Sequence, residues 1–253
     1  MSTDFEPATR SAFPQGTAPL TPPRPPRPPR PMPPSGHHRP ARFAVQLLSA
    51  LLVITCGGAL LMLALLDRST QTQNFTEAVT QVQVNTDTGD VAIHAAEPGA
   101  DTSVVTRTKS IYSSPQHTAV VRDGVLMVSG SCRNQLFLVS MCSVDFDITV
   151  QAGARIQAHS STGDVQIRSI TGPVTAAAGD GDVRLEFGQA PDQARAGSDT
   201  GDVRIELPGQ ERYRVEASTG TGDTKVSVPV SDSSSRIIQA STGTGDVTVT
   251  TNR

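Results

Sequence analysis

The sequence predicts an all-β domain built as a β-solenoid-like stack of strand repeats, preceded by one transmembrane α-helix and a disordered Pro-rich tail. Three observations lead to this fold class: a Gly-Asp pair that recurs past residue 80, an uncharged apolar stretch over residues 43–66, and 13 of the 19 prolines within the first 42 residues. Of the 253 residues only 4% are aromatic, and none is Trp. This composition argues against a large enzyme with a wide apolar cofactor pocket.

Residues 1–42 are predicted to be a disordered cytoplasmic tail. The run from Thr21 to Pro34, TPPRPPRPPRPMPP, is mostly proline. Because proline lacks a backbone N–H, this run is expected to be solvated polyproline II or disordered. In polyproline II, Arg24, Arg27 and Arg30 would share one edge at a spacing of about 9 Å. Contact with anionic lipid, recognition by a protein with an aromatic groove, and a plain spacer all remain open.

The stretch over residues 43–66 contains 24 residues and no charge. Because about 20 apolar residues are enough to cross a bilayer, this stretch is predicted to be a transmembrane helix. Six Arg against two acidic residues precede it, so the positive-inside rule places the N-terminus in the cytoplasm and the C-terminal part outside the plasma membrane. A cleaved signal peptide is the alternative, which the length of the run and the lack of a cleavage site disfavour. Residues 67–79 are then expected to be a juxtamembrane spacer, and residues 80–253 an extracytoplasmic domain.

The Gly-Asp pair organises the rest of the chain. Apolar residues recur one and three positions after most of the aspartates, as in Val183 and Leu185, and Val, Ile or Ala recurs six and eight positions before. Even spacing places these side chains on one face of a strand, so each unit is predicted to be strand, turn, strand. The six pairs are Gly89-Asp90, Gly163-Asp164, Gly181-Asp182, Gly201-Asp202, Gly222-Asp223 and Gly245-Asp246.

A unit of about 20 residues cannot bury an apolar face alone, so we expect the units to stack around one continuous core. An ordinary β-sandwich also fits the strand spacing, but it does not explain why the same residue types recur in register. The glycine before each aspartate indicates a positive φ. The interval of 74 positions from Asp90 to Asp164 would hold about three further units that lack the signature, and Asp123-Gly124 within it predicts a hairpin turn.

Cys132 and Cys142 lie in the segment predicted to be extracytoplasmic, where thiols are commonly oxidised, so we predict that they form a disulfide. The closed loop of about 11 residues would stabilise the fold by roughly 3 kcal/mol. A metal site is the alternative, but two cysteines ten residues apart with no nearby His offer too few ligands.

The stacked aspartates would lie about 4.8 Å apart, where like charges repel by roughly 1 kcal/mol in water. We expect each carboxylate to accept hydrogen bonds from backbone N–H groups of its own turn. Two alternatives use Asp164, Asp182, Asp202, Asp223 and Asp246 chemically: Ca²⁺ binding along the row, and a carboxylate pair that acts on a glycosidic bond. The sequence contains no GxSxG, HExxH, P-loop or CxxC motif. We therefore expect no catalytic residue and no cofactor.

The segment VDFDITVQAGARIQAHSSTGDVQI (Val144 to Ile167), followed by GDGDVRL, DTGDVRI, TGTGDTKV and TGTGDVTV, resembles a bacterial family of β-strand-repeat domains of unknown function labelled "putative adhesin". The resemblance covers about residues 80–251. It implies an exported, membrane-anchored, stacked-β domain and carries over no catalytic residue. Gln151 stands where many members have proline, a small departure that leaves the expected fold unchanged.

Together these features predict a single-pass bacterial envelope protein that is not an enzyme. Its external domain would be a binding or structural surface for envelope polymer or another protein. The C-terminal strand, Val247 to Thr251, would leave an open sheet edge at which two copies could self-associate. A cation-dependent or carbohydrate-active module on the Asp row and transmembrane signalling through the Pro/Arg tail are the alternatives. No nucleic-acid partner is expected.

Overall fold

The computed structural model describes residues 67–111, 113–133 and 141–252. The predicted cytoplasmic tail and the predicted membrane helix lie outside these ranges. Within the described residues, no helix has the length and apolar character needed to cross a membrane. These residues instead form 17 β-strands, which confirms the all-β fold predicted for this part of the chain.

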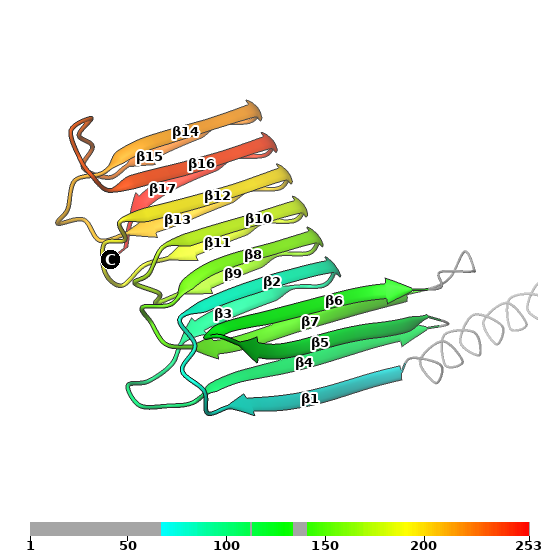
Figure 1. The fold of residues 1–253 in the computed structure, drawn as a ribbon. Coiled ribbons are helices and arrows are strands. Elements are labelled where there is room, and N and C mark those ends of the chain that lie inside the picture. The colour runs from blue at the N-terminus through cyan, green and yellow to red at the C-terminus, as the bar shows by residue number, and fades with distance from the viewer. Residues whose placement is uncertain (1–66, 112, 134–140, 253) are drawn as a thin grey trace, which may run out of the picture. The chain divides into compact units, whose positions relative to one another are not determined.

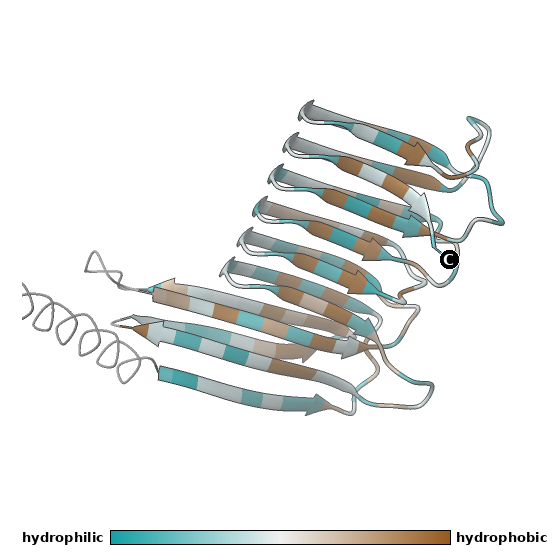
Figure 2. Cartoon of the chain, turned by 180° about the vertical axis from the view of Figure 1, so that it is seen from behind, coloured by the Kyte–Doolittle hydropathy of each residue, from teal (hydrophilic) through white to brown (hydrophobic). Residues whose placement is uncertain are grey.

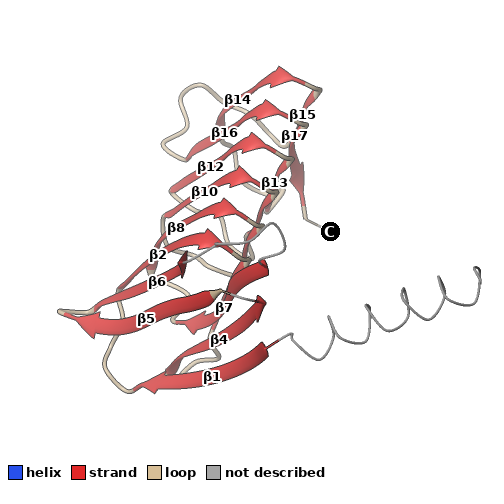
Figure 3. Ribbon diagram, turned by 90° about the vertical axis from the view of Figure 1, so that its right-hand side faces the viewer, coloured by secondary structure: helices blue, strands red, loops and turns tan. Residues whose placement is uncertain are grey.

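The strands form two sheets that face each other across one core (Figures 1 and 3). Sheet A contains, in spatial order, β1 (Asp67–Phe75), β4 (Thr102–Ile111), β7 (Met141–Val150), β3 (Val91–Ala95), β9 (Val165–Arg168), β11 (Val183–Glu186), β13 (Val203–Leu207), β17 (Val247–Thr251) and β15 (Thr224–Ser227). Sheet B contains β14 (Arg214–Thr221), β16 (Ile237–Thr244), β12 (Gln193–Thr200), β10 (Val174–Asp180), β8 (Arg155–Thr162), β2 (Gln81–Thr88), β6 (Val125–Arg133) and β5 (Ser114–Arg122).

Each Gly-Asp unit forms one rung of the stack, with its first strand in sheet B and its second in sheet A. The rungs, named by their aspartates, are Asp90 (β2, β3), Asp164 (β8, β9), Asp182 (β10, β11), Asp202 (β12, β13), Asp223 (β14, β15) and Asp246 (β16, β17). Neighbouring rungs pair in parallel and in register, so that Val183 lies between Val165 and Val203. The side chains at these even positions are buried in the Asp182 rung and its neighbours, and Figure 2 shows the resulting alternation of apolar and polar residues along the strands.

The interval of 74 positions from Asp90 to Asp164 does not contain three further units. β2 pairs directly with β8, and β3 with β9, so the Asp90 and Asp164 rungs are neighbours. The inserted strands instead close the N-terminal end: β6 and β7 continue the parallel stack, while β5 and β4 pair with them antiparallel. β5 and β6 form a hairpin, and the hairpin turn predicted between them at Asp123-Gly124 is confirmed, with φ of 53° and 78°.

Two other features of this end bear on the sequence analysis. The segment over residues 67–79, expected to be a spacer, contains β1, which pairs with β4 from Asp67 through Phe75. β1 is a mostly exposed edge strand, so its polar sequence carries no apolar alternation that would have revealed it. The disulfide between Cys132 and Cys142 is present, with a Cα–Cα distance of 5.9 Å, and it links β6 of sheet B to β7 of sheet A.

The last two units stack in reversed order. The Asp246 rung, although last in sequence, lies between the Asp202 and Asp223 rungs. The prediction of an open edge at Val247 to Thr251 is therefore wrong, because β17 pairs with β13 on one side and β15 on the other. At this end of the stack the open edges are β14 in sheet B and β15 in sheet A, while β5 and β1 are the edge strands at the N-terminal end. The serine-rich loop between β15 and β16 carries the chain back to the inserted position.

Candidate functional site

The Gly-Asp corners form one row along an edge of the stack, and glycine is required there for two reasons. The six corner glycines have φ between 136° and 152°, a conformation that side chains rarely adopt. A Cβ built on Gly201 would also lie 2.2 Å from the carbonyl oxygen of Gly181 in the next rung. The rungs therefore approach backbone to backbone at this edge, which confirms the predicted positive φ and adds a steric reason for it.

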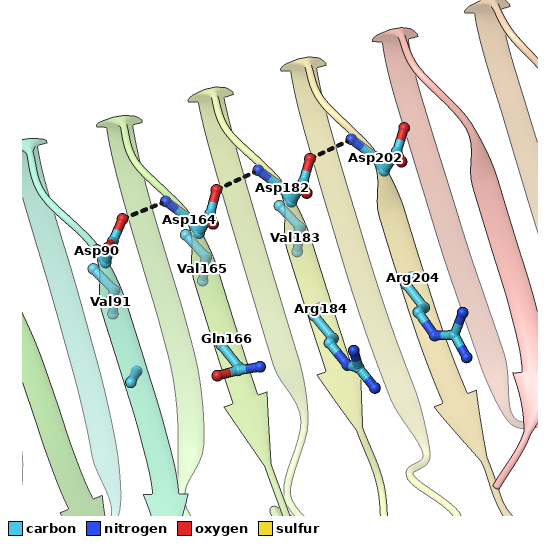
Figure 4. A pocket seen from close by; sticks show the side chains of 11 residues that line it. Asp90, Val91, Asp164, Val165, Gln166, Asp182, Val183, Arg184, Asp202 and Arg204 are labelled. Atoms are coloured by element: carbon cyan, nitrogen blue, oxygen red, sulfur yellow. Dashed lines mark hydrogen bonds between the residues drawn. The ribbon is translucent and has the colours of Figure 1, made fainter.

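The aspartates of the corner row are linked from rung to rung. In each case the backbone N–H of one Asp donates to Oδ1 of the Asp in the preceding rung, as Figure 4 shows for the first four corners. The N to Oδ1 distances are 3.0 Å for Asp164 to Asp90, 2.8 Å for Asp182 to Asp164, 2.8 Å for Asp202 to Asp182, 2.8 Å for Asp246 to Asp202 and 2.8 Å for Asp223 to Asp246. The carboxylates thus bond the neighbouring turn, and the expectation that each bonds its own turn is wrong.

This arrangement explains how a row of like charges is tolerated. A hydrogen bond to a charged acceptor contributes about 1.5–3 kcal/mol, whereas neighbouring charges at this spacing repel by roughly 1 kcal/mol in water. Each bond also joins two rungs, so the carboxylate that repels its neighbour helps to hold that neighbour in place. The row therefore has a structural role that its charge alone does not reveal.

Asp145 begins the row, although it is not part of a Gly-Asp pair. The N–H of Asp90 donates to Asp145 Oδ1 at 3.2 Å, and Lys109 Nζ lies 3.0 Å from Oδ2. Burial acts to raise the pKa of the Asp145 carboxyl, but the hydrogen bonds from Ser143, Lys109 and the Asp90 N–H outweigh it, and the pKa lies below its ordinary value. Sequence reasoning missed this residue because Val144 replaces the glycine, although Phe146 and Ile148 follow at the positions that the repeat predicts.

Asp223 ends the row. Its N–H donates to Asp246, but among the hydrogen bonds of the described residues none is donated to the Asp223 carboxylate. Its rung is the last of the stack, and all four residues of β15 are exposed. The row of hydrogen bonds therefore runs in one direction. At one end Asp145 is paired with Lys109, and at the other end Asp223 is exposed.

A second row, of buried hydroxyl groups, runs beside the aspartates and was not predicted. In five of the six rungs the residue four positions before the corner Asp donates its hydroxyl to a corner carbonyl of the preceding rung; four of these residues are buried and Thr219 is half-buried. The donors and acceptors are Thr86 to Val144 (3.4 Å), Ser160 to Gly89 (2.9 Å), Ser198 to Gly181 (2.8 Å), Thr242 to Gly201 (2.8 Å) and Thr219 to Gly245 (2.8 Å). Ala178 occupies this position in the Asp182 rung and interrupts the row. The sequence signal was a Ser or Thr at a fixed spacing from five of the six aspartates.

A shallow groove of about 350 Å³ follows the corner row on the outside of sheet A (Figure 4). Its walls carry Asp90, Asp164, Asp182 and Asp202 on one side, and Gln166, Arg184 and Arg204 on the other. Both arginines donate to Glu206 Oε1, at 2.8 Å from Arg184 and 2.7 Å from Arg204. The bond from Arg204, aided by Arg184 and opposed by burial, holds the pKa of Glu206 below its ordinary value.

Cation binding along the corner row gains no ligand set from this geometry. The described residues contain no group of three or more His, Cys, Asp or Glu side chains placed to hold a metal ion. In every inter-rung bond one carboxylate oxygen is already an acceptor. Asp164, Asp182, Asp202, Asp223 and Asp246 are brought into one row as predicted, and what the row does is join the rungs.

The two outer faces of the stack differ in charge. Sheet A carries ion pairs such as Arg107–Asp147 at 3.3 Å and Lys109–Asp145 at 3.0 Å. Sheet B instead presents two hollows of about 670 and 590 Å³, which meet at Thr175 and Ala177 on β10. Their linings are mostly uncharged: Gln83, Asn85, Gln157, Ser218, Gln239 and Ser241 recur along them. We call this joined trough the sheet B trough.

The chain is similar to one protein family and to solved bacterial proteins. The family model described as Toastrack DUF4097 matches residues 76–253. A crystal structure described as a "putative cell adhesion protein" from Clostridium sporogenes is similar to the chain, with a TM-score of 0.54 and 11% identity, covering 74% of this chain and 100% of that one. A "putative adhesin" from Bacteroides fragilis has 12% identity and a TM-score of 0.32, covering 73% of this chain and 97% of that one. No curated protein matches the chain significantly.

Proposed function

The chain belongs to the Toastrack DUF4097 family, and from this premise we propose that it is a single-pass bacterial envelope protein whose external domain is a rigid, non-catalytic binding surface. The sheet B trough is the surface, and an extended polar polymer of the cell envelope is its ligand. The adhesion description of the similar solved protein from Clostridium sporogenes is in line with a binding role.

The observation that carries this proposal is the regular, mostly neutral lining of the trough. Outward positions on successive strands of sheet B repeat at the strand spacing of about 4.8 Å. Along one such row the polar residues are Gln83, Gln157, Thr175, Arg195 and Gln239, beside the small residues Ala177 and Gly197. An extended chain with repeated polar groups can lie along such a trough and exchange the same hydrogen bonds at several places. Since each site is weak, affinity would come from their number.

The same trough gives the test of binding. Cosedimentation of the protein with purified cell-wall polymer should retain the wild type in the pellet. Ala177→Arg, at the junction of the two hollows, should weaken retention at least tenfold without changing the melting temperature, because Ala177 points outward from sheet B. Gln166→Arg, on the outer side of sheet A, is the matched control and should bind as wild type. Equal retention of both variants would contradict the proposal.

Membrane attachment through residues 43–66 is the second part of the proposal. β1 begins at Asp67, immediately after this apolar stretch, and its pairing with Ser110, which in turn pairs with Cys142, places that end at the corner edge of the stack. The corner edge would then be nearest the bilayer, with both outer faces accessible from the side. Protease added to intact spheroplasts should remove the C-terminal domain and spare a tag at residue 1; the reverse pattern would refute this topology.

A further inference from the structure

The two ends of the stack differ in how the core is covered. At the N-terminal end, the outermost strands β1 and β5 approach each other, since His117 Nε2 lies 2.9 Å from Gln71 Oε1. Val104 and Leu126 behind them are fully buried. At the C-terminal end, Val226 is 40% exposed, although its counterparts Val249 and Ile205 in the next rungs are 0% exposed. The core therefore ends at an uncovered apolar surface, which solenoid proteins usually close with a capping element.

Both sheets also end there with open backbone edges. The N–H of Arg214 donates to the carbonyl of Arg236 at 2.9 Å, so the even-numbered residues of β14 face β16. Because alternate residues of a parallel strand face opposite neighbours, the backbone groups of Val215, Ala217 and Thr219 face outward. In β15, the bond from Val247 N–H to the Asp223 carbonyl (2.9 Å) turns the backbone groups of Thr224 and Val226 outward by the same reasoning.

We propose that two copies of this chain associate end to end through the Asp223 rung, with β14 pairing antiparallel to β14 and β15 to β15 about one two-fold axis. The partner must supply two strands at once, spaced as the two sheets are, about 10 Å apart. A single extended peptide would cover one edge and leave the other edge and Val226 exposed. The same rung of a second copy supplies both strands with the required spacing.

The positions of the outward-facing groups fit this symmetry. An axis perpendicular to the sheets that passes beside Ala217 and Val226 would pair each of these residues with itself. A residue that lies opposite its own copy in an antiparallel ladder can exchange two backbone hydrogen bonds with it only if its N–H and C=O face the second copy. The N–H and C=O groups of Ala217 and Val226 both face that way. The remaining outward-facing residues, Val215 and Thr219, would pair with each other across the same axis.

Charge and closure favour the same arrangement. Because the two-fold axis reverses the strand direction, the Asp223 corners of the two copies lie at opposite edges and do not repel each other. The outer face of β14 carries Arg214 and Glu216, one charge of each sign, and that of β15 carries the single charge of Lys225, so neither copy presents a charged block to the other. Since the same surface of each copy pairs about the two-fold axis, the contact is isologous and closes at a dimer.

The test uses the full-length chain in detergent micelles with Cys56→Ser, so that Cys132 and Cys142 remain paired. Ala217→Cys should form a disulfide-linked dimer under mild oxidation, because residues opposite each other in a hydrogen-bonded pair have Cα atoms about 5.5 Å apart. Ala240→Cys is the matched control: it occupies the same position one rung inward, is 2% exposed, and should remain monomeric.

A second variant separates pairing from folding. Ala217→Pro removes an N–H that faces away from β16, so it should leave the melting temperature within a few degrees of wild type while sedimentation shifts from dimer to monomer. Val226→Lys should have the same effect on sedimentation by charging the uncovered core. The proposal is overturned if the wild-type chain sediments as a monomer at about 100 µM, a hundred times a micromolar Kd, or if Ala217→Cys cross-links no faster than Ala240→Cys.

Discussion

Replacing Gly201 by alanine is expected to lower the free energy of unfolding by about 2–6 kcal/mol. Two costs add. The φ of 141° is a conformation that costs a residue with a Cβ about 1–3 kcal/mol. The new Cβ would also lie 2.2 Å from the Gly181 carbonyl oxygen, so the rungs must separate by roughly 1 Å to reach ordinary contact, at an overpacking cost of about 1–3 kcal/mol. That separation stretches the 2.8 Å bond from Asp202 to Asp182.

The assay is urea unfolding followed by far-UV circular dichroism, with Gly188→Ala as the matched control. A Cβ built on Gly188 has no atom within 4 Å, and Gly188 has no positive φ. Its replacement should change the free energy of unfolding by less than about 1 kcal/mol, in the stabilising direction, because alanine reduces the entropy of the unfolded chain. If Gly201→Ala and Gly188→Ala unfold at the same urea concentration, the close approach of the corners does not constrain the stack and the argument fails.

Substitutions at the hydroxyl row, at Glu206 and at the disulfide test three other features of the stack. Ala178→Ser should raise stability by about 0.5–1.5 kcal/mol in urea unfolding, because its hydroxyl would fill the gap in the buried hydroxyl row; a loss of stability would mean that the gap is sterically required. Glu206 has a pKa below its ordinary value, chiefly through the bond from Arg204, so its contribution is present above the unfolded-state pKa of about 4.5 and is lost as the pH falls through the lower folded-state pKa. Stability measured from pH 6 to pH 3 should therefore fall less steeply in Glu206→Gln than in wild type, and parallel curves would refute the assignment. Replacing both Cys132 and Cys142 by serine should lower the free energy of unfolding by roughly 3 kcal/mol, as measured by calorimetry. Reductant should cause the same loss in the wild type and no further loss in the double variant.

The repeat could be predicted from sequence because its determinants are local. Even spacing fixes which side chains share a face, and a glycine before Asp164 or Asp202 signals a backbone that other residues cannot adopt. These two rules predicted the rungs, their register and the row of corners. The hydrogen-bond partner of each aspartate could not be predicted from one unit. Whether Oδ1 accepts from its own turn or from the next rung depends on the distance between rungs, which the sequence of a single unit does not specify.

The N-terminal end was harder to predict for a related reason. Asp145 performs the function of a corner aspartate without its glycine, because Val144 begins no tight turn: β7 is reached from β6 by a longer connection that Cys132–Cys142 closes. β1 pairs through its backbone along an edge and buries little. A pattern search that depends on glycine or on apolar alternation finds neither feature.

The reversed order of the last two rungs follows from their different apolar content. Both carry the segment ASTGTGD, so either could pair with the Asp202 rung in the same register. The Asp246 rung has Ile238, Val247 and Val249 at core positions, and all three are 0% exposed in the inserted position. At the equivalent positions the Asp223 rung has Val215, Thr224 and Val226, which bury less apolar surface. Placing the more apolar rung inside and the threonine-bearing rung outside lowers the free energy of the stack. With this order the Asp223 rung lies at the end of the stack. Its polar residues can be exposed in a monomer, and Val226 would become buried when a second copy binds.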